Sequence, residues 1–454
     1  MYSDLDEIRL AEETRHCTVK RLYERMERSG VYRAYILYRG GEFTLSHPEL
    51  LAPIEVFLKR KSLAFAEHEA IFIGREEGID TLFFAFVHNT RRGLAQGGLC
   101  FRKYSTLLEL IEDGLKLSRD MTRKNAMARL WWGGGKGIMA LPFSVDDQSE
   151  VAPSGRRKKY FEAYGRFVAS LRGLYYTADG PGISARDLEV IHKHNRYTTC
   201  APMATDDCDD PSPYAAKAVL RALQAAWRFL EAGSLKGVKV AVQGGGAVGT
   251  ALVSALDDLG AEVWMADSAN PDQLKLLKEI RPSLHIVEQD DDLYDLDVDI
   301  FSPCADGAVI NAHTIPRLKA KLVCGSASNI LSSPDDARRL QEKGIAFVPD
   351  IICTCVEAIN CADNWMAYLP EEIFRNAVEK VYSDTFKILD YAKRHRTTTI
   401  EAAEMMADAE AKQSHPFLRD RGEKIIEHLV DNYWADAPFA AQYAMAVGGY
   451  GASL

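Results

Sequence analysis

The stretch VKVAVQGGGAVGTALVSALDDLGA, residues 238–261, joins three patterns without a break. VKVAVQ is typical of a buried β-strand, and ALVSALDDLGA is typical of a helix. Between them, Gly244, Gly246 and Gly249 have the spacing G-x-G-x-x-G. A strand, this glycine loop and a helix form the context that binds the pyrophosphate of a dinucleotide at the helix N-terminus. We therefore predict an α/β protein with a doubly wound, Rossmann-type domain.

A second strand pattern, EVWMAD, ends at Asp267, about 20 residues beyond Gly246, where an acid can hydrogen-bond the adenosine ribose. No arginine follows closely to accept a 2′-phosphate, so NAD is favoured over NADP. A Rossmann fold that has lost its ligand stays open as the alternative. The predicted cofactor-binding residues are Gly244, Gly246, Ala247, Val248, Gly249, Asp267, Cys304, Ala305, Ser328 and Asn329.

Three further apolar runs follow: DIFSPC (299–304), AKLVCGSASN (320–329) and IAFVPD (345–350). Each ends in small or polar residues, as buried parallel strands do when their carboxyl ends line a ligand crevice. Upstream, AIFIG and TLFFAFVHN predict a pair of strands around residues 70–89. Thr106 and Glu109 form a capping-box pattern that predicts the start of a helix.

A second glycine-rich stretch, MTRKNAMARLWWGGGKGIM, spans residues 121–139. Lys124 and Lys136 bracket three glycines, which we interpret as a turn that an anionic ligand can approach closely. Two ammonium groups suit a substrate carboxylate, and a partly desolvated lysine can serve in acid–base chemistry. A nucleotide P-loop is excluded because Gly137, not Ser or Thr, follows Lys136. A surface turn with solvated lysines remains the alternative.

The stretch GGLCFRKYSTLLELIEDGLKLSRDMTRKNAMARLWWGGGKGI, residues 97–138, resembles the glutamate/leucine/phenylalanine/valine dehydrogenase family, and its leucine-specific members most. The similarity extends from about residue 67 to about residue 418. It implies two domains, and the expected limits are 1–209 for a catalytic domain (1–65 being an addition), 210–375 for the Rossmann domain, and 376–454 for C-terminal helices that return to the catalytic domain, plus a tail.

The resemblance also implies roles. A lysine at the position of Lys124 holds the substrate carboxylate, and one at the position of Lys136 polarises the 2-oxo group or activates water. Hydride passes between the substrate Cα and nicotinamide. The family aspartate that moves protons corresponds to Gly180 here, with Asp179 one residue early. A local backbone shift through Gly180 and Pro181 could return Asp179 to that role; otherwise it is a loop residue.

Other departures surround the expected nicotinamide position. Ser328 replaces an asparagine of the family, and Glu357 falls where the family has glycine. Glu357 could serve as counter-ion or as a replacement acid–base group, or it could be a solvated residue at a helix start. The predicted catalytic residues are Lys136, Lys124, Asp179 and Glu357. The predicted substrate-binding residues are Gly97, Gly98, Lys124 and Gln96.

Because glutamate-specific members carry lysine where this chain has Gln96, glutamate is not the expected substrate. The net charge of −10 disfavours nucleic acid and anionic membranes as partners. No apolar run reaches the ~20 residues of a membrane-spanning helix. The acidic N-terminus does not resemble a signal peptide, and the nine cysteines are interpreted as free thiols of a cytoplasmic protein.

Cys353, Cys355 and Cys361 fit no standard zinc spacing, so no metal site is predicted. The resemblance implies a homo-oligomer. The expected function is NAD-linked oxidoreduction at a carbon that bears nitrogen, in an amino acid, a 2-oxo acid or an imine. Two alternatives stay open: an inactive subunit that binds NAD or an amino acid, and a non-redox enzyme that uses Lys136.

Overall fold

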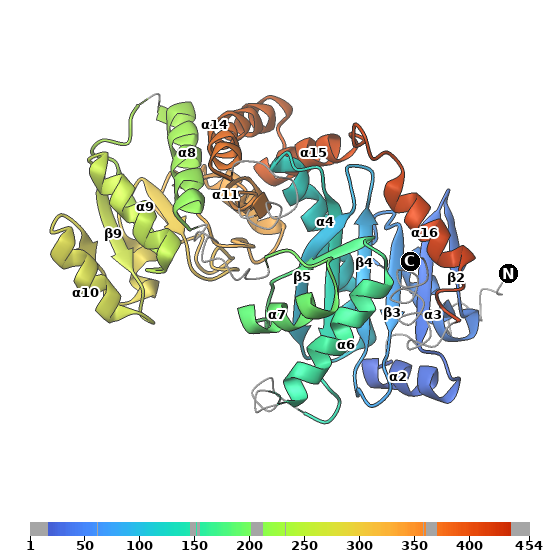
Figure 1. The fold of residues 1–454 in the computed structure, drawn as a ribbon. Helices are drawn as coiled ribbons and strands as arrows, with labels where there is room; N and C mark the ends of the chain where they lie inside the picture. Colours follow the sequence, from blue (N-terminus) through green and yellow to red (C-terminus); the bar gives the residue numbers. More distant parts are fainter. Residues whose placement is uncertain are drawn as a thin grey trace. The chain divides into compact units, whose positions relative to one another are not determined.

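A computed structural model describes residues 17–60, 62–145, 151, 155–200, 212–231, 233–356, 358–359 and 370–436. The chain divides into two compact units, which are described separately (Figure 1). Unit 1 contains residues 1–126, 131–207 and 411–454, and unit 2 contains residues 127–130 and 208–410. Among the described residues, no helix combines the length and the apolar character that crossing a membrane requires.

Unit 1 is built on a seven-stranded mixed sheet in the order β2-β1-β3-β4-β6-β5-β7. β5 runs parallel to β6 and to β7, and the other neighbours are antiparallel. Its strands are β1 (Arg33–Arg39), β2 (Glu42–Leu45), β3 (Ala70–Gly74), β4 (Phe83–Asn89), β5 (Ala95–Arg102), β6 (Gly133–Ala140) and β7 (Tyr175–Ala178), and its helices are α2 (Val19–Arg28), α3 (Pro48–Arg60), α4 (Leu107–Met127), α6 (Arg156–Ser170), α7 (Ala185–His194) and α16 (Arg421–Asp431).

Alternate residues of β4 bury opposite faces of this sheet, as the two-residue period of a strand requires. Phe83 and Val87 pack in a core that includes residues of α6 and α16. Phe84 and Phe86 pack on the other face with residues of α2, α3 and α4. The predicted strand pair is confirmed by β3 and β4, and β1 and β2 extend the same sheet from the segment expected to be an addition.

The predicted capping box at the start of α4 is confirmed in one of its two bonds. The Glu109 amide donates to Thr106 Oγ1 at 3.1 Å, whereas the Glu109 carboxylate accepts from the amide of Ser105, one residue earlier, at 2.8 Å.

The glycine triplet before Lys136 is not the turn that the sequence predicted. Residues 133–140 form β6, a fully buried strand. None of the three glycines has a positive φ. They are needed because neighbours leave no room for a side chain: a Cβ at Gly134 would lie 2.0 Å from Thr122 Oγ1, and one at Gly133 would lie 2.0 Å from the Asn89 oxygen.

Unit 2 is built on a parallel six-stranded sheet in the order β10-β9-β8-β11-β12-β13, which confirms the predicted Rossmann-type arrangement. Its strands are β8 (Lys239–Gln243), β9 (Glu262–Ala266), β10 (His285–Ile286), β11 (Ile300–Pro303), β12 (Leu322–Val323) and β13 (Ala346–Phe347), and its helices are α8 (Ser212–Glu231), α9 (Ala247–Asp258), α10 (Pro271–Ile280), the 3-10 helix η1 (Asp290–Asp295), α11 (Asp335–Glu342), α12 (Asp350–Thr354), α14 (Pro370–His395) and α15 (Thr399–Ala411).

The expectation that the chain returns to the first domain from residue 376 places that return too early. Val381 and Leu389 of α14 lie in one core with Val219 and Leu223 of α8. The buried alanines of α15 join the same core. The chain belongs to unit 1 again only from residue 411. The apolar face of α14 is satisfied by α8, which explains the difference.

Candidate functional site

Three neighbouring strands of unit 1 bring together four predicted site residues. Gly97 and Gly98 lie on β5, Lys136 lies on β6, and Asp179 follows β7. A Cβ at Gly98 would lie 2.0 Å from the carbonyl oxygen of Asp179 and 3.5 Å from Lys136 Nζ. The absence of a side chain at Gly98 therefore lets the lysine head group and the Asp179 backbone border the same small space.

Lys136 is 7% exposed. Within the described part of the chain, its ammonium group makes no hydrogen bond and no ion pair. A buried charge without a partner is costly, so it signals a group kept for an anionic or polar ligand. The predicted alternative of a solvated surface lysine is wrong for Lys136.

Lys124 is half-buried on α4. One turn earlier, Met121 meets β5: a Cβ at Gly97 would lie 3.0 Å from Met121 Cγ and 1.8 Å from the Gly135 oxygen. Residues three apart on a helix share a face, so Lys124 lies on the side of α4 that approaches β5.

Asp179 is exposed and directly follows β7, and its backbone oxygen packs against Gly98. At the next position, a Cβ on Gly180 would lie 2.3 Å from the Leu99 oxygen. The backbone is therefore built around glycine at the position where the resemblance places an aspartate. An aspartate cannot be introduced there unless the main chain moves.

Gln96 belongs to a buried polar network. Its Oε1 accepts from Asn125 Nδ2 at 3.2 Å, and its Nε2 donates to Thr199 Oγ1 at 3.5 Å. Asn125 also donates to the Gly133 oxygen at 2.7 Å, which ties α4 to β6. Asn125 Oδ1 and Trp132 Nε1 are buried without a hydrogen-bond partner among the described residues. Such atoms mark places where a ligand or water completes the structure.

The sequence analysis did not identify the side chains that hold together α4 and β6, the elements that carry Lys124 and Lys136. His88 Nδ1 and Thr122 Oγ1 are 2.7 Å apart, and Thr122 packs directly on Gly134. The rings of His88 and His68 are in edge contact at 4.6 Å. His88 therefore supports the packing of α4 against β6.

In unit 2, the glycine fingerprint has the shape that a dinucleotide requires. Gly244 has a φ of 109°, and a Cβ at Gly249 would lie 2.0 Å from the Gly244 oxygen. A Cβ at Gly246 would meet nothing within 4 Å. Gly246 is the N-cap of α9, and it has no side chain that could cap the first helical turn. The amides of that turn, including those of Ala247 and Val248, can therefore donate to a phosphate.

Asp267 follows β9 and is held by four hydrogen bonds. Its Oδ2 accepts from the Gly245 amide at 2.7 Å, and its Oδ1 accepts from the Ala269 and Asn270 amides. Burial raises the pKa of the Asp267 carboxyl, but the hydrogen bonds from the Asn270 side chain and from the loop amides outweigh it and hold the pKa below its ordinary value. The group is an anion fixed beside the fingerprint.

The loops after β11 and β12 gather at the same edge of the sheet. A Cβ at Gly244 would lie 2.8 Å from Ala305 Cβ and 2.9 Å from the Cys304 oxygen. The Ala308 amide donates to the Asn329 oxygen at 2.7 Å, which joins the two loops. Ser328 and Asn329 are exposed there. Burial raises the pKa of the Cys304 thiol, so the thiol stays protonated.

Glu357 lies outside the described residues, as does Cys361. The described cysteines, Cys353 and Cys355 among them, are not in disulfide bonds, and no cluster of potential metal ligands occurs among the described residues.

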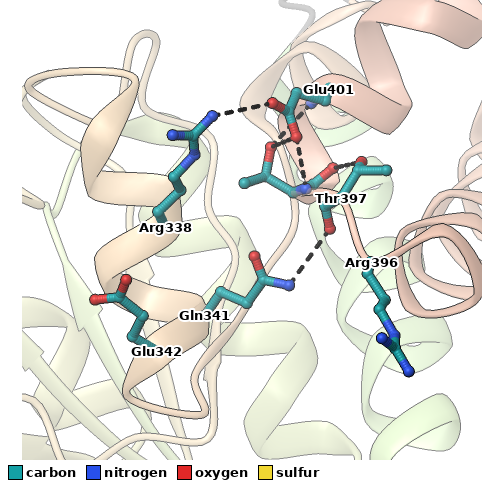
Figure 2. Close-up of a pocket in the computed structure, with 7 residues that line it drawn as sticks. Arg338, Gln341, Glu342, Arg396, Thr397 and Glu401 are labelled. Atoms are coloured by element: carbon teal, nitrogen blue, oxygen red, sulfur yellow. Dashed lines mark hydrogen bonds and ion pairs between the residues drawn. The ribbon is translucent and has the colours of Figure 1, made fainter.

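A separate pocket of about 400 Å³ lies between α11 and the start of α15 in unit 2 (Figure 2). Arg338 pairs with Glu401 at 3.6 Å, and Glu401 accepts from the amide and the hydroxyl of Thr398. The pocket contains none of the predicted site residues, and two of its four charged side chains, Arg338 and Glu401, form an ion pair.

Fold and site together define a two-unit α/β protein that has a dinucleotide fingerprint in one unit and a buried lysine site in the other. Family profiles match part of each unit: "Glutamate/Leucine/Phenylalanine/Valine dehydrogenase" over residues 267–415, and "Glu/Leu/Phe/Val dehydrogenase, dimerisation domain" over residues 76–197. The chain belongs to this family of NAD(P)-dependent dehydrogenases.

Individual relatives agree. The chain is 35% identical to leucine dehydrogenase of Thermoactinomyces intermedius over 352 residues, which cover 76% of this chain and 92% of that one. It is 32% identical to phenylalanine dehydrogenase of Lysinibacillus sphaericus over 366 residues, covering 79% and 93%. The crystal structure of L-tryptophan dehydrogenase from Nostoc punctiforme matches with a TM-score of 0.66 and 28% identity, covering 79% of this chain and 97% of that one.

Proposed function

We propose that this chain catalyses the NAD-linked interconversion of a 2-amino acid with its 2-oxo acid and ammonia, on a substrate other than glutamate. The observation that carries the proposal is Lys136, buried beside Gly98 without an internal partner among the described residues. The names of the relatives, which are dehydrogenases of apolar amino acids, support the same reaction.

In the proposed mechanism, the ammonium group of Lys124 binds the substrate carboxylate and fixes the orientation of the Cα. In the deamination direction, bound NAD supplies the acceptor for the hydride that leaves this Cα. Lys136 in its amine form takes a proton from the water that attacks the resulting imine carbon. Once the nitrogen of this adduct is protonated, its C–N bond breaks and ammonia leaves. The hydroxyl group loses its proton and becomes the 2-oxo oxygen, to which the ammonium form of Lys136 donates a hydrogen bond.

A carboxylate must still carry protons to and from the substrate nitrogen. Gly180 has no side chain and cannot carry these protons. The atom of Asp179 that borders the space beside Gly98 is its backbone oxygen. We propose Asp179 or Glu357 for this step. Replacing Glu357 by Gln separates the two: an unchanged pH profile and turnover number would leave Asp179 as the acid–base group.

The substrate side chain is proposed to be uncharged. Gln96 is uncharged and hydrogen-bonded to Asn125 and Thr199, and no described cation joins this network to receive a distal carboxylate. Branched, aromatic and indole side chains, named by the relatives, are the first to test.

The cofactor-binding residues are proposed as predicted: Gly244, Gly246, Ala247, Val248, Gly249, Asp267, Cys304, Ala305, Ser328 and Asn329. The described cysteines are not in disulfide bonds, which is compatible with the proposed cytoplasmic location. The match of residues 76–197 to a dimerisation domain supports a homo-oligomer.

The test has two parts. NADH is titrated against the full-length protein while nucleotide fluorescence is followed, and NADH oxidation is then measured with ammonia and a panel of branched, aromatic and indole 2-oxo acids. Binding together with turnover on at least one acid supports the proposal. Binding without turnover on any acid would instead support a subunit that binds NAD but does not catalyse.

Gly180 favours that second candidate function, because it removes the family's proton carrier. Restoring an aspartate at this position is a weak test of the second candidate. The variant Gly180→Asp places its Cβ against the Leu99 oxygen, so we expect loss of stability rather than a gain of activity. A clear gain would show that the main chain here can shift.

A further inference from the structure

The loop between β9 and α10 has the form of an anion-binding site that the chain itself fills. Successive backbone N–H groups in such a loop can cradle an anion. Here the amides of Ser268, Ala269 and Asn270 are all engaged by two carboxylates. Asp267 Oδ1 accepts from Ala269 at 3.1 Å and from Asn270 at 3.0 Å, and Asp290 Oδ1 accepts from Ser268 at 3.0 Å.

Asp290 reaches this loop because β10 lies parallel beside β9, so that the chain leaves both strands at the same edge of the sheet. Its second oxygen, Oδ2, accepts from the hydroxyl of Ser268 at 2.8 Å. Ser268 directly follows Asp267, and a phosphate on the ribose would approach it. Both the amide and the hydroxyl of Ser268 already donate hydrogen bonds to the Asp290 carboxylate.

The two carboxylates keep their negative charge unpaired. Neither Asp267 nor Asp290 forms an ion pair with a described lysine or arginine. Their neighbours in η1 differ, because Asp291 and Asp295 both pair with Arg317. The end of β9 thus carries two adjacent fixed anions.

We propose that Asp290 is a specificity-determining residue, which together with Asp267 rejects the 2′-phosphate of NADP. The inference rests on the proposed function, in which this edge of unit 2 binds the adenosine ribose of NAD. A 2′-phosphate would have to displace Asp290 from Ser268 and remain close to both carboxylates. The ribose hydroxyls of NAD meet no such repulsion and can donate to Asp267.

The test compares the dissociation constants of NADH and NADPH, measured by nucleotide fluorescence on the full-length protein. Asp290→Asn removes the charge and keeps an acceptor for Ser268, whereas Asp290→Ser also releases its donors. In both variants we expect the ratio of NADPH to NADH affinity to rise about tenfold, the order expected when one charge near a phosphate dianion is removed.

Asp292→Asn is the matched control. It lies in the same 3-10 helix, changes the net charge equally, is exposed, and makes no side-chain hydrogen bond or ion pair with a described residue. Its affinity ratio is expected to stay that of the unaltered protein. An equal rise of the ratio in the control would show that the effect depends only on net charge, and it would overturn the role of Asp290. An unchanged ratio in both Asp290 variants would overturn it as well.

The unaltered protein separates this inference from the function on which it rests. If it binds neither NADH nor NADPH, the dinucleotide assignment itself fails, and this inference fails with it. If it binds NADH while the Asp290 variants keep its preference, only the role of Asp290 is overturned. Competition of 2′-AMP and 5′-AMP with NADH gives the same comparison without the nicotinamide. Relative to the unaltered protein, 2′-AMP should displace NADH at lower concentration in the Asp290 variants and at the same concentration in the Asp292→Asn control.

Discussion

The chain contains the letters GGGK once and GGGA once, and the two triplets solve opposite problems. In β6 of unit 1, Gly133, Gly134 and Gly135 are extended and buried, and each would force its Cβ within 3 Å of a neighbour. In the β8–α9 loop of unit 2, Gly246 is open on all sides.

The difference teaches that glycine has two distinct uses around a ligand. The buried triplet lets α4 and β5 pack against the backbone of β6, so that Lys136 is held rigidly. The second triplet, here called the open triplet after Gly246, leaves room at a helix N-terminus for a ligand to come close, while Gly244 packs against Ala305. Substitutions can therefore be designed to damage folding in one region and binding in the other.

The largest effect is expected from the residue that follows the buried triplet. Lys136→Met removes the group proposed to polarise the 2-oxo oxygen, and kcat/KM should fall by about 10²- to 10⁴-fold, the usual contribution of a positioned acid–base group. Steady-state kinetics on the best 2-oxo acid of the panel measure it. Lys158→Met, at an exposed position of α6, is the control and should change little. Retention of half the activity by the Lys136 variant would remove this lysine from the mechanism.

The next effect is on stability. Gly134→Ala puts a Cβ 2.0 Å from Thr122 Oγ1 and 2.3 Å from the Thr122 amide, and the backbone contact cannot be relieved by a side-chain rotation. Overpacking of this kind costs about 1–3 kcal/mol. Urea unfolding should show the midpoint shifted down by a corresponding amount. A variant as stable as the unaltered chain would mean that α4 and β6 separate easily, contrary to the packing described.

The sequence predicts the open triplet well because its signal is local. A strand pattern, a glycine spacing and a helix pattern are contiguous, and all three appear as β8, the loop and α9. The same holds for the start of α4, where Thr106 and Glu109 are three residues apart.

The buried triplet could not be predicted in the same way. Glycine has a low strand propensity, so GGG followed by Lys reads as a turn. It becomes a strand only because β4 and β5, distant in sequence, pair on either side of it. The contact of Ser268 with Asp290, 22 residues apart, and the packing of α14 on α8 likewise depend on tertiary structure, to which local periodicity is blind.

A smaller effect on stability is expected in the open triplet. Gly246 has a φ of −66° and free space, so Gly246→Ala gains about 0.4–1 kcal/mol through the unfolded chain. Because glycine is preferred to alanine at a helix N-cap, a loss of similar size offsets this gain, and stability should change by less than about 1 kcal/mol. The same methyl group obstructs the proposed approach of the pyrophosphate, so NADH affinity should fall. Urea midpoints and fluorescence titration measure the two quantities on one sample. Full NADH affinity in this variant would show that the phosphates do not pass Gly246.

The smallest effect concerns pH and again distinguishes the two regions. His68 is buried beneath the buried triplet, where its Nδ1 accepts from the Ala66 amide and its Nε2 lies 2.9 Å from the Leu115 oxygen. Burial, with help from the neighbouring His88 and Arg119, holds the pKa of His68 well below its ordinary value.

Because the unfolded chain protonates this ring at about pH 6.5 and the folded chain does not, the unfolded state binds more protons at lower pH. Stability is therefore full above about pH 6.5 and decreases as the pH falls below it, by about 1 kcal/mol between pH 7.5 and 5.5. His68→Gln should lose this dependence, while the exposed His313→Gln should keep it. Hydrogen exchange of the β3 and β6 amides, compared with that of β8, reports the loss locally. Equal acceleration in β8 would show that the acid sensitivity does not originate at His68.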